Sequence, residues 1–322
     1  MASAAPAGAA GAAPSNPLLA IPHGSVAAAS VISAAFLLLA LPVAYSLRRT
    51  RFRIYLLLLA SVVLRGVAFA LHAAAQAPGL DRAGAGGREA GFHALRAAGF
   101  GMAIGVCALV LVTWFKNAAP WAKPFGPRVA AAAGVLARAL VPIVIISGPI
   151  LGAIFAGFLY GAPKEGQWLV ALNGVRYAST WALTAAVIAV VLLAAFAAAC
   201  VFIGARRRQV EGGAPSGAPE TVWHDVHSQI LLLLAAALVL VVPAAQRVDS
   251  LYNADALLDE GHFYGMSPVP ELVSVALLAT PFVMGRMAMA YNWEAYMQGR
   301  ASGAKDGKEY SGDQAVVTAD SY

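Results

Sequence analysis

The chain has 322 residues, of which 60% are apolar and only 12% are charged. A soluble domain carries about a quarter charged residues, so this composition excludes a soluble globular protein. The formal net charge of +6 does not indicate nucleic-acid binding, because the cations lie in short clusters at the ends of apolar segments and not in basic stripes. Membrane lipids, and anionic inner-leaflet headgroups at the basic loops, are the expected partners.

The apolar segments predict an all-α fold, a seven-transmembrane-helix bundle. Residues 1–25 are rich in Ala, Pro and Gly and lack a basic start, which favours a disordered tail over a signal peptide. Each later apolar stretch is long enough to cross a bilayer as a helix. We place the spans at 26–47, 54–75, 92–115, 129–160, 177–203, 226–245 and 272–291, so that 26–291 is the membrane domain and 292–322 a polar tail.

Three features of the connections and spans carry further predictions. The Gly-rich stretch at 79–89 and the stretch at 209–225 are expected to be loops. The fourth segment is longer than a bilayer requires, so it must tilt, begin as an interfacial helix, or kink at Pro142 and at Gly148-Pro149. Small residues in spans three and four, such as Gly101 and Gly148, predict close helix packing there and a bundle core through these two spans.

The distribution of Lys and Arg predicts the topology. The loops after spans one, three and five and the C-terminal tail carry most of the cations. The opposite side carries Arg82, Arg88, Lys164, Arg176 and Arg247, with Arg96 close by. The positive-inside rule therefore predicts an outside N-terminus and a cytoplasmic C-terminus. We expect the protein in the plasma membrane or another secretory-pathway membrane.

Three arginines inside the spans are the predicted ligand-binding residues. Arg65 lies about 12 residues into span two, or roughly 18 Å by helical rise, and Arg138 and Arg286 lie in the inner parts of spans four and seven. No acidic residue is expected at matching depth. The arginines should then find carbonyls, water or an anionic ligand such as a lipid phosphate. Snorkelling to the inner interface is the alternative for Arg138 and Arg286, whereas Arg65 is too central and is expected to face a cavity.

The stretch 246–271 is the longest strongly polar connection, and we expect it to form an outer vestibule or lid. Its predicted site residues are Arg247, Asp249, Asp255, Asp259, Glu260, Tyr264 and Glu271. The same carboxylates would attract a cationic or amine ligand.

Other chemistries find little support in the sequence. His72, His93 and His262 fall on one side and could join the acidic stretch in a zinc site, although no HxxxH or HExxH pair fixes two ligands on one helix. No lysine lies in a span to hold retinal, and the histidines stand at span ends, not stacked as for haem. No phosphate-binding or nucleophile-elbow motif occurs. We therefore expect no cofactor, and the absence of an acidic residue within the spans argues against proton coupling.

The layout resembles the fungal lipid-translocating exporter family across about residues 26–295. The likeness at residue level lies in Arg247 and Asp249 at the end of span six, Glu271 at the start of span seven, and Tyr264 between them. The resemblance implies seven spans, an outside N-terminus and a link to lipid asymmetry and toxin resistance. That family usually has a second Arg followed by Glu after span six and an Asp within span seven, which this chain lacks.

The sequence favours a non-enzymatic membrane protein that binds or translocates an anionic amphiphile such as a lipid. A seven-span receptor for an extracellular ligand is the alternative. The layout also looks like that of G-protein-coupled receptors, but Thr113 to Asn117 replaces the DRY motif and the NPxxY motif is missing. A zinc hydrolase at the outer face is the third candidate.

Overall fold

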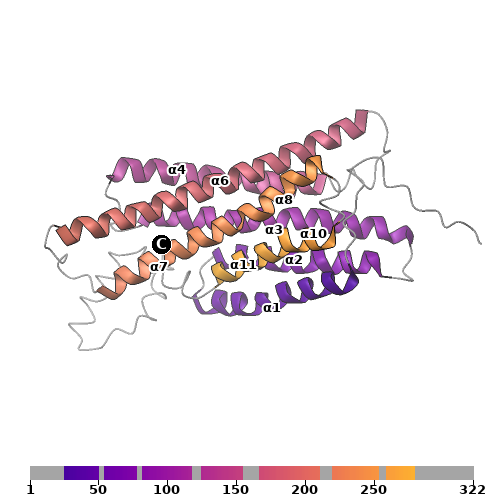
Figure 1. The fold of residues 1–322 in the computed structure, drawn as a ribbon, viewed down its shortest axis with the longest axis horizontal. Coiled ribbons are helices and arrows are strands. Elements are labelled where there is room, and N and C mark those ends of the chain that lie inside the picture. The colour runs from indigo at the N-terminus through magenta and orange to yellow at the C-terminus, as the bar shows by residue number, and fades with distance from the viewer. Residues whose placement is uncertain are drawn as a thin grey trace, which may run out of the picture.

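The computed structural model of the chain describes residues 25–50, 54–77, 82–117, 125–154, 167–210, 220–253 and 259–279. Within these ranges the fold is all-helical and contains no strand (Figure 1). The helices are α1 (Val26–Thr50), α2 (Ile54–Gln76), α3 (Arg82–Asn117), α4 (Pro127–Ile145), the π-helical turn η3 (Ile146–Ile150), α6 (Gln167–Val210), α7 (Glu220–Val239), α8 (Val241–Tyr252), α10 (Glu260–Met266) and α11 (Pro268–Ala279).

Six helices in the described part of the chain are long and apolar enough to cross a membrane, which makes this an integral membrane protein. The stretches are Val26–Arg48, Ile54–Gln76, Gly87–Lys116, Pro127–Ile154, Asn173–Gly204 and Gln229–Tyr252. They correspond to the first six predicted spans. The seventh, 272–291, is described only as far as Ala279, within α11, so the count of seven spans stays a prediction.

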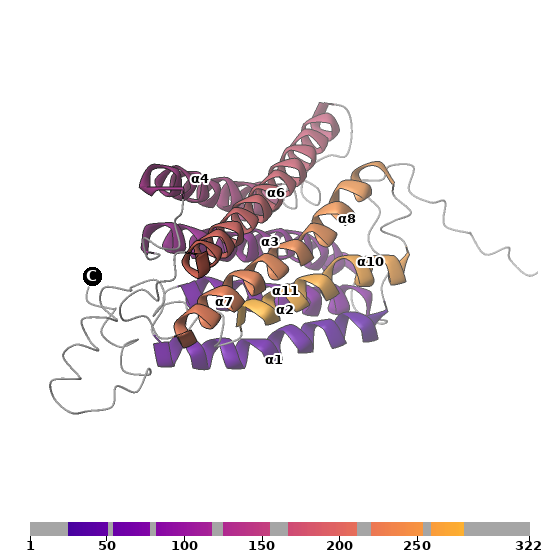
Figure 2. The same ribbon diagram turned by 60° about the vertical axis from the view of Figure 1, so that its left-hand side comes forward.

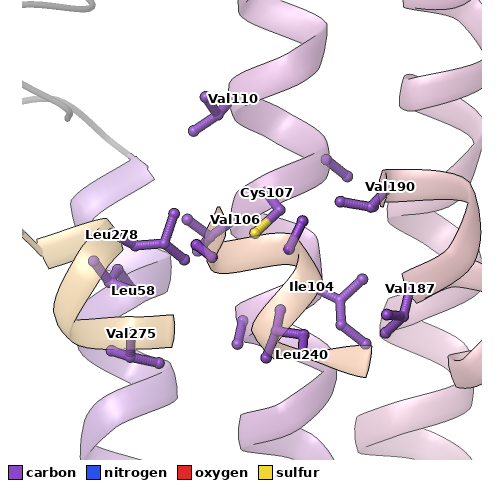
Figure 3. Packing of buried hydrophobic residues seen from close by; sticks show 14 of the residues in the cluster. Leu58, Ile104, Val106, Cys107, Val110, Val187, Val190, Leu240, Val275 and Leu278 are labelled. Carbon is purple, nitrogen blue, oxygen red and sulfur yellow. The ribbon is translucent and has the colours of Figure 1, made fainter. Parts of the chain in front are cut away.

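The helices pack around α3. In its most apolar stretch 78% of the residues are buried, against 28% in α1 and in the Pro127–Ile154 stretch. Helices α2, α4 and α6 contact α3, while α11 packs between α7 and α1 (Figures 1 and 2). Figure 3 shows the resulting core, where Ile104 and Cys107 of α3 meet side chains of α6, Leu240 and α11.

The close contact between spans three and four is confirmed. A Cβ atom on Gly101 of α3 would lie 3.1 Å from the carbonyl oxygen of Val144 and 3.2 Å from the Cα of Gly148. Glycine therefore lets the two backbones touch, as expected of small residues in lipid. The buried centre is α3, however, and most of α4 is exposed to the surroundings of the bundle.

The long fourth span is irregular where a kink was expected. The α-helix runs through Pro142 and changes to a π-helical turn containing Gly148 and Pro149. Proline lacks the backbone N–H of the regular pattern, and π-helical turns accommodate such an interruption.

Three stretches that were expected as loops or as a polar connection are largely helical where the structure describes them, and the first two change the site. Helix α3 begins at Arg82, so the prediction of a loop at 79–89 is wrong from Arg82 onward. Its alanines favour helix, and Glu89 is buried against α2. The polar stretch 246–271 is also helical as far as Tyr252 and again from Glu260. The stretch 209–225 is helical to Val210 and from Glu220.

Candidate functional site: a buried arginine cluster

Arg65 is paired with an acidic residue inside the bundle. Its side chain on α2 is 1% exposed, and its Nη2 forms an ion pair with Oε2 of Glu271, which is 2% exposed. The expectation that no carboxylate reaches the depth of Arg65 is therefore wrong. Glu271 belongs to the first turn of α11, and α11 contacts both α1 and α2, so a residue at the start of this helix already lies inside the bundle.

Arg96 of α3 joins the same group through hydrogen bonds. It is buried, and its Nη2 donates to Oγ of Ser267 at 2.8 Å and to Oε1 of Gln246 at 3.3 Å. The Ser267 hydroxyl in turn donates to Oε1 of Glu271 at 3.4 Å. Ser267 thus connects the second arginine to the single carboxylate. The guanidinium also lies 4.7 Å from the ring centroid of Phe263, a favourable cation–π contact.

Arg247 of α8 is the third arginine, and its contacts are the longest. Its Nη2 lies 3.9 Å from Oε1 of Glu271 and donates to the carbonyl oxygen of Arg96 at 3.5 Å. Its guanidinium stands 4.4 Å from the ring centroid of Phe100, and Arg65 approaches the same ring at 5.9 Å. We call Arg65, Arg96, Arg247 and Glu271 the arginine cluster.

The arginine cluster carries excess positive charge. Three guanidinium groups against one carboxylate give a formal charge of 3 − 1 = +2. Three buried donor atoms, Arg65 Nη1, Arg96 Nε and Arg247 Nε, have no hydrogen-bond partner among the residues that the structure describes. Buried polar groups are nearly always hydrogen-bonded. Oxygens of an anion would satisfy such donors and offset the charge.

Local sequence features make room for Arg65 between α2 and α3. A Cβ atom on Gly99 would lie 2.8 Å from Cγ of Arg65, so only glycine leaves this space. Ser61, one turn before Arg65, donates its hydroxyl hydrogen bond to the carbonyl oxygen of Gly99 at 2.8 Å. The two helices are therefore held together beside the arginine.

The three candidate zinc ligands have separate neighbours. His72 is fully buried with its Nδ1 3.3 Å from Oε1 of Glu89. Nε2 of His262 lies 3.7 Å from Oδ2 of Asp249, and the ring of His93 packs on that of Phe92. Among the described residues, no group of three His, Cys, Asp or Glu side chains could hold a metal ion.

Those of the remaining predicted site residues that the structure describes do not join the arginine cluster. Arg138 is exposed on α4, and Arg286 and Asp255 lie outside the described residues. Asp259 caps α10, where its Oδ1 accepts from the backbone N–H of His262 at 3.1 Å. Glu260 accepts a hydrogen bond from the backbone N–H of Ser25 at 2.8 Å.

Tyr264 is buried on α10 beside the aromatic core. Its ring centroid lies 6.3 Å from that of Phe69. Burial, together with the negative charge of Glu260, raises the pKa of the Tyr264 phenol to about 12. The hydroxyl therefore remains protonated at physiological pH and acts as a neutral polar group.

Sequence reasoning missed Arg96 and underrated Glu271 and Arg247. A third span that begins at residue 92 puts Arg96 near the outer side. From the true start at Arg82, Arg96 is 14 residues along the helix, or about 21 Å. The available signal was the Ala-rich helical composition of 82–98, which the glycines obscured.

No protein-family model, no curated protein and no solved structure matches this chain.

Proposed function

We propose that this integral membrane protein binds or translocates an anionic amphiphile such as a lipid, with the arginine cluster receiving the anionic headgroup. The single observation that carries the proposal is the excess of three arginines, two buried and one partly buried, over the one carboxylate of the cluster. Each of these arginines has a buried donor atom without a hydrogen-bond partner among the described residues. Buried charge at membrane depth is costly, so its retention marks function.

Arg247 is the arginine best suited to an exchangeable ligand. Its two polar contacts are 3.5 Å and 3.9 Å long, whereas Arg65 and Arg96 hold closer partners. An anion near Arg247 would displace little existing bonding. A charge-assisted bond to the anion would replace a long contact to Glu271.

The test is lipid movement in proteoliposomes with fluorescent phosphatidylserine and fluorescent phosphatidylcholine. Arg247→Gln removes one cation and keeps a polar side chain. We expect it to slow the movement of phosphatidylserine at least about tenfold, the effect of losing roughly 1.4 kcal/mol of charge-assisted bonding, with a smaller effect on phosphatidylcholine.

The matched control is Arg138→Gln, which removes the same charge from an exposed site on α4. It should move phosphatidylserine at the wild-type rate. Equal rates for wild-type and Arg247→Gln protein, with both folded, would overturn the proposal.

The finer topology is part of the same proposal. We infer seven spans, an outside N-terminus and a cytoplasmic C-terminus, in the plasma membrane or another secretory-pathway membrane. The support is the distribution of Lys and Arg between the loops. The basic loops would then face the anionic lipids of the inner leaflet.

The receptor alternative gains nothing from the contacts of the acidic residues. Asp259 and Glu260, which would meet a cationic ligand, accept hydrogen bonds from backbone N–H groups. Asp249 is exposed and lies near His262. These contacts are those of residues that stabilise the ends of helices.

A further inference from the structure

A second buried ionisable pair lies between α2 and α3, away from the arginine cluster. Nδ1 of His72 lies 3.3 Å from Oε1 of Glu89, and Nε2 of His72 lies 3.0 Å from the side-chain amide nitrogen of Gln76. His72 is 0% exposed and Glu89 is 4% exposed. The imidazole stacks on Phe92, with ring centroids 4.4 Å apart. Both ionisable groups are thus cut off from water.

Glu89 is incompletely paired for a buried carboxylate. Its Oε2 is buried and has no hydrogen-bond partner among the described residues. A buried carboxylate with one bare oxygen is costly when charged. A proton taken up by the pair lowers this cost, because it either neutralises Glu89 or turns the contact with His72 into a full ion pair.

The charged surroundings of the pair are mostly cationic. The charges that act on His93 together with His72 are those of Arg96, Arg176 and Arg247, and Glu260 and Arg96 act together with Glu89 on Tyr264. Arg88 precedes Glu89 on α3, Arg65 lies on the same helix as His72, and His262 precedes Phe263, whose ring lies 6.5 Å from that of His72. Cations oppose the uptake of a further proton. Neutralising the arginine cluster, which lies on the same two helices, removes positive charge from these surroundings.

The pair and the arginine cluster share the same two helices. His72 is seven residues from Arg65 on α2, and Glu89 is seven residues from Arg96 on α3. Seven residues are two helical turns, about 10 Å along the axis. The ring of Phe92 lies between them, stacked on His72 and 5.9 Å from the guanidinium of Arg96.

We propose that His72 and Glu89 form a buried proton-binding site whose loading is coupled to anion binding at the arginine cluster. An anion that neutralises the arginines removes the repulsion, and the pair then takes up a proton. Coupling of this kind is reciprocal, so a protonated pair strengthens anion binding. At an effective dielectric constant of about 20, unit charges about 10 Å apart change each other's binding by about tenfold. The coupling rests on the proposed function, whereas the proton site does not.

The first experiment tests the proton site without any lipid ligand. Infrared difference spectra of the purified protein are recorded on a pH step, with and without ¹⁵N-labelled histidine. We expect bands of a titrating carboxyl or imidazole that disappear in Glu89→Gln and in His72→Gln. Glu260→Gln, a change near the surface, should retain them. Wild-type spectra without such bands, or bands that persist in both variants, would overturn the proton site.

The second experiment tests the coupling in the same sample. Short-chain phosphatidylserine is added to weakly buffered protein near pH 6.5, the ordinary pKa of histidine, and bound lipid and released or absorbed protons are both measured. We expect uptake of a proton, at most about one per bound lipid, with none in Glu89→Gln and none with phosphatidylcholine. Lipid binding without proton uptake overturns the coupling alone. Absence of lipid binding overturns the proposed function, and the infrared result still decides the proton site.

Discussion

The contact between Arg65 and Glu271 gives the sharpest prediction about stability. Glu271→Gln removes the only carboxylate that the described residues place in the arginine cluster, and it leaves Arg65 buried at 1% exposure without its ion-pair partner. Breaking a buried ion pair by removing one member costs about 3–5 kcal/mol. We expect the lower end of this range, because helices unfolded within a membrane still find polar partners.

A double-mutant cycle isolates the interaction energy between Arg65 and Glu271. Arg65→Gln removes one of three cations, so in the absence of Glu271 it should relieve repulsion with Arg96 and Arg247. The double variant should therefore be more stable than the sum of the single effects predicts, by about 1–3 kcal/mol. Reversible unfolding in mixed detergent micelles, analysed by linear extrapolation, measures the free energy of unfolding.

The control for the cycle is Glu260→Gln, which keeps an acceptor for the backbone N–H of Ser25. It should change the free energy of unfolding by less than about 0.5 kcal/mol. If Glu271→Gln is no more costly than this control, or if the double variant is additive within about 0.5 kcal/mol, the reasoning about the arginine cluster is refuted.

Two further predictions concern packing and topology. Gly152→Ala should destabilise the protein by about 1–3 kcal/mol, because its new Cβ would lie 2.5 Å from Cβ of Ala97. The control Gly174→Ala, with open space around it, should be neutral or slightly stabilising. Unfolding titrations that show equal effects of the two substitutions would contradict the close packing at Gly152. The topology is tested in a variant that lacks Cys107 and Cys200, both buried, and carries one new cysteine at either end of the chain. A cysteine at the N-terminus should react with an impermeant maleimide on intact cells, whereas one at the C-terminus should react only after permeabilisation. The reverse pattern would refute the inferred orientation.

The membrane class and six of the spans followed from hydropathy alone. Apolar stretches of this length have few alternatives in water, and lipid demands internally satisfied helices. The positions of the first two helix starts were right, because a polar residue directly precedes each apolar stretch, Ser25 before the first and Arg53 before the second. The role of Arg65 as an interior residue also followed from its central place in span two.

The partners of Arg65 could not be predicted, because pairing depends on which helices are neighbours. Glu271 stands at the start of an apolar segment, and hydropathy places such a residue at the interface. Its true depth is set by the packing of α11 against α2 and α7. The same reason applies to Glu89, which reads as part of a Gly-rich loop but is stabilised inside the bundle by His72.

The acidic stretch at 246–271 shows a further difference between pattern and packing. As a sequence it looks like one polar loop. In the fold, Gln246 and Glu271 are buried and face Arg96 and Arg65, whereas Asp249 is exposed. Helical periodicity thus divides the polar residues between the interior and the surface, and that division required knowledge of where α8 and α11 begin.

The most direct test of the central claim is photo-crosslinking of purified protein with two lipids that differ only in headgroup charge. We predict that a photoactivatable phosphatidylserine labels peptides of α3 around Arg96 and of α8 around Arg247, that a matched phosphatidylcholine labels them weakly, and that Arg247→Gln abolishes the difference. Equal labelling of these peptides by both lipids, or labelling that is unchanged in Arg247→Gln, would contradict a headgroup site at the arginine cluster.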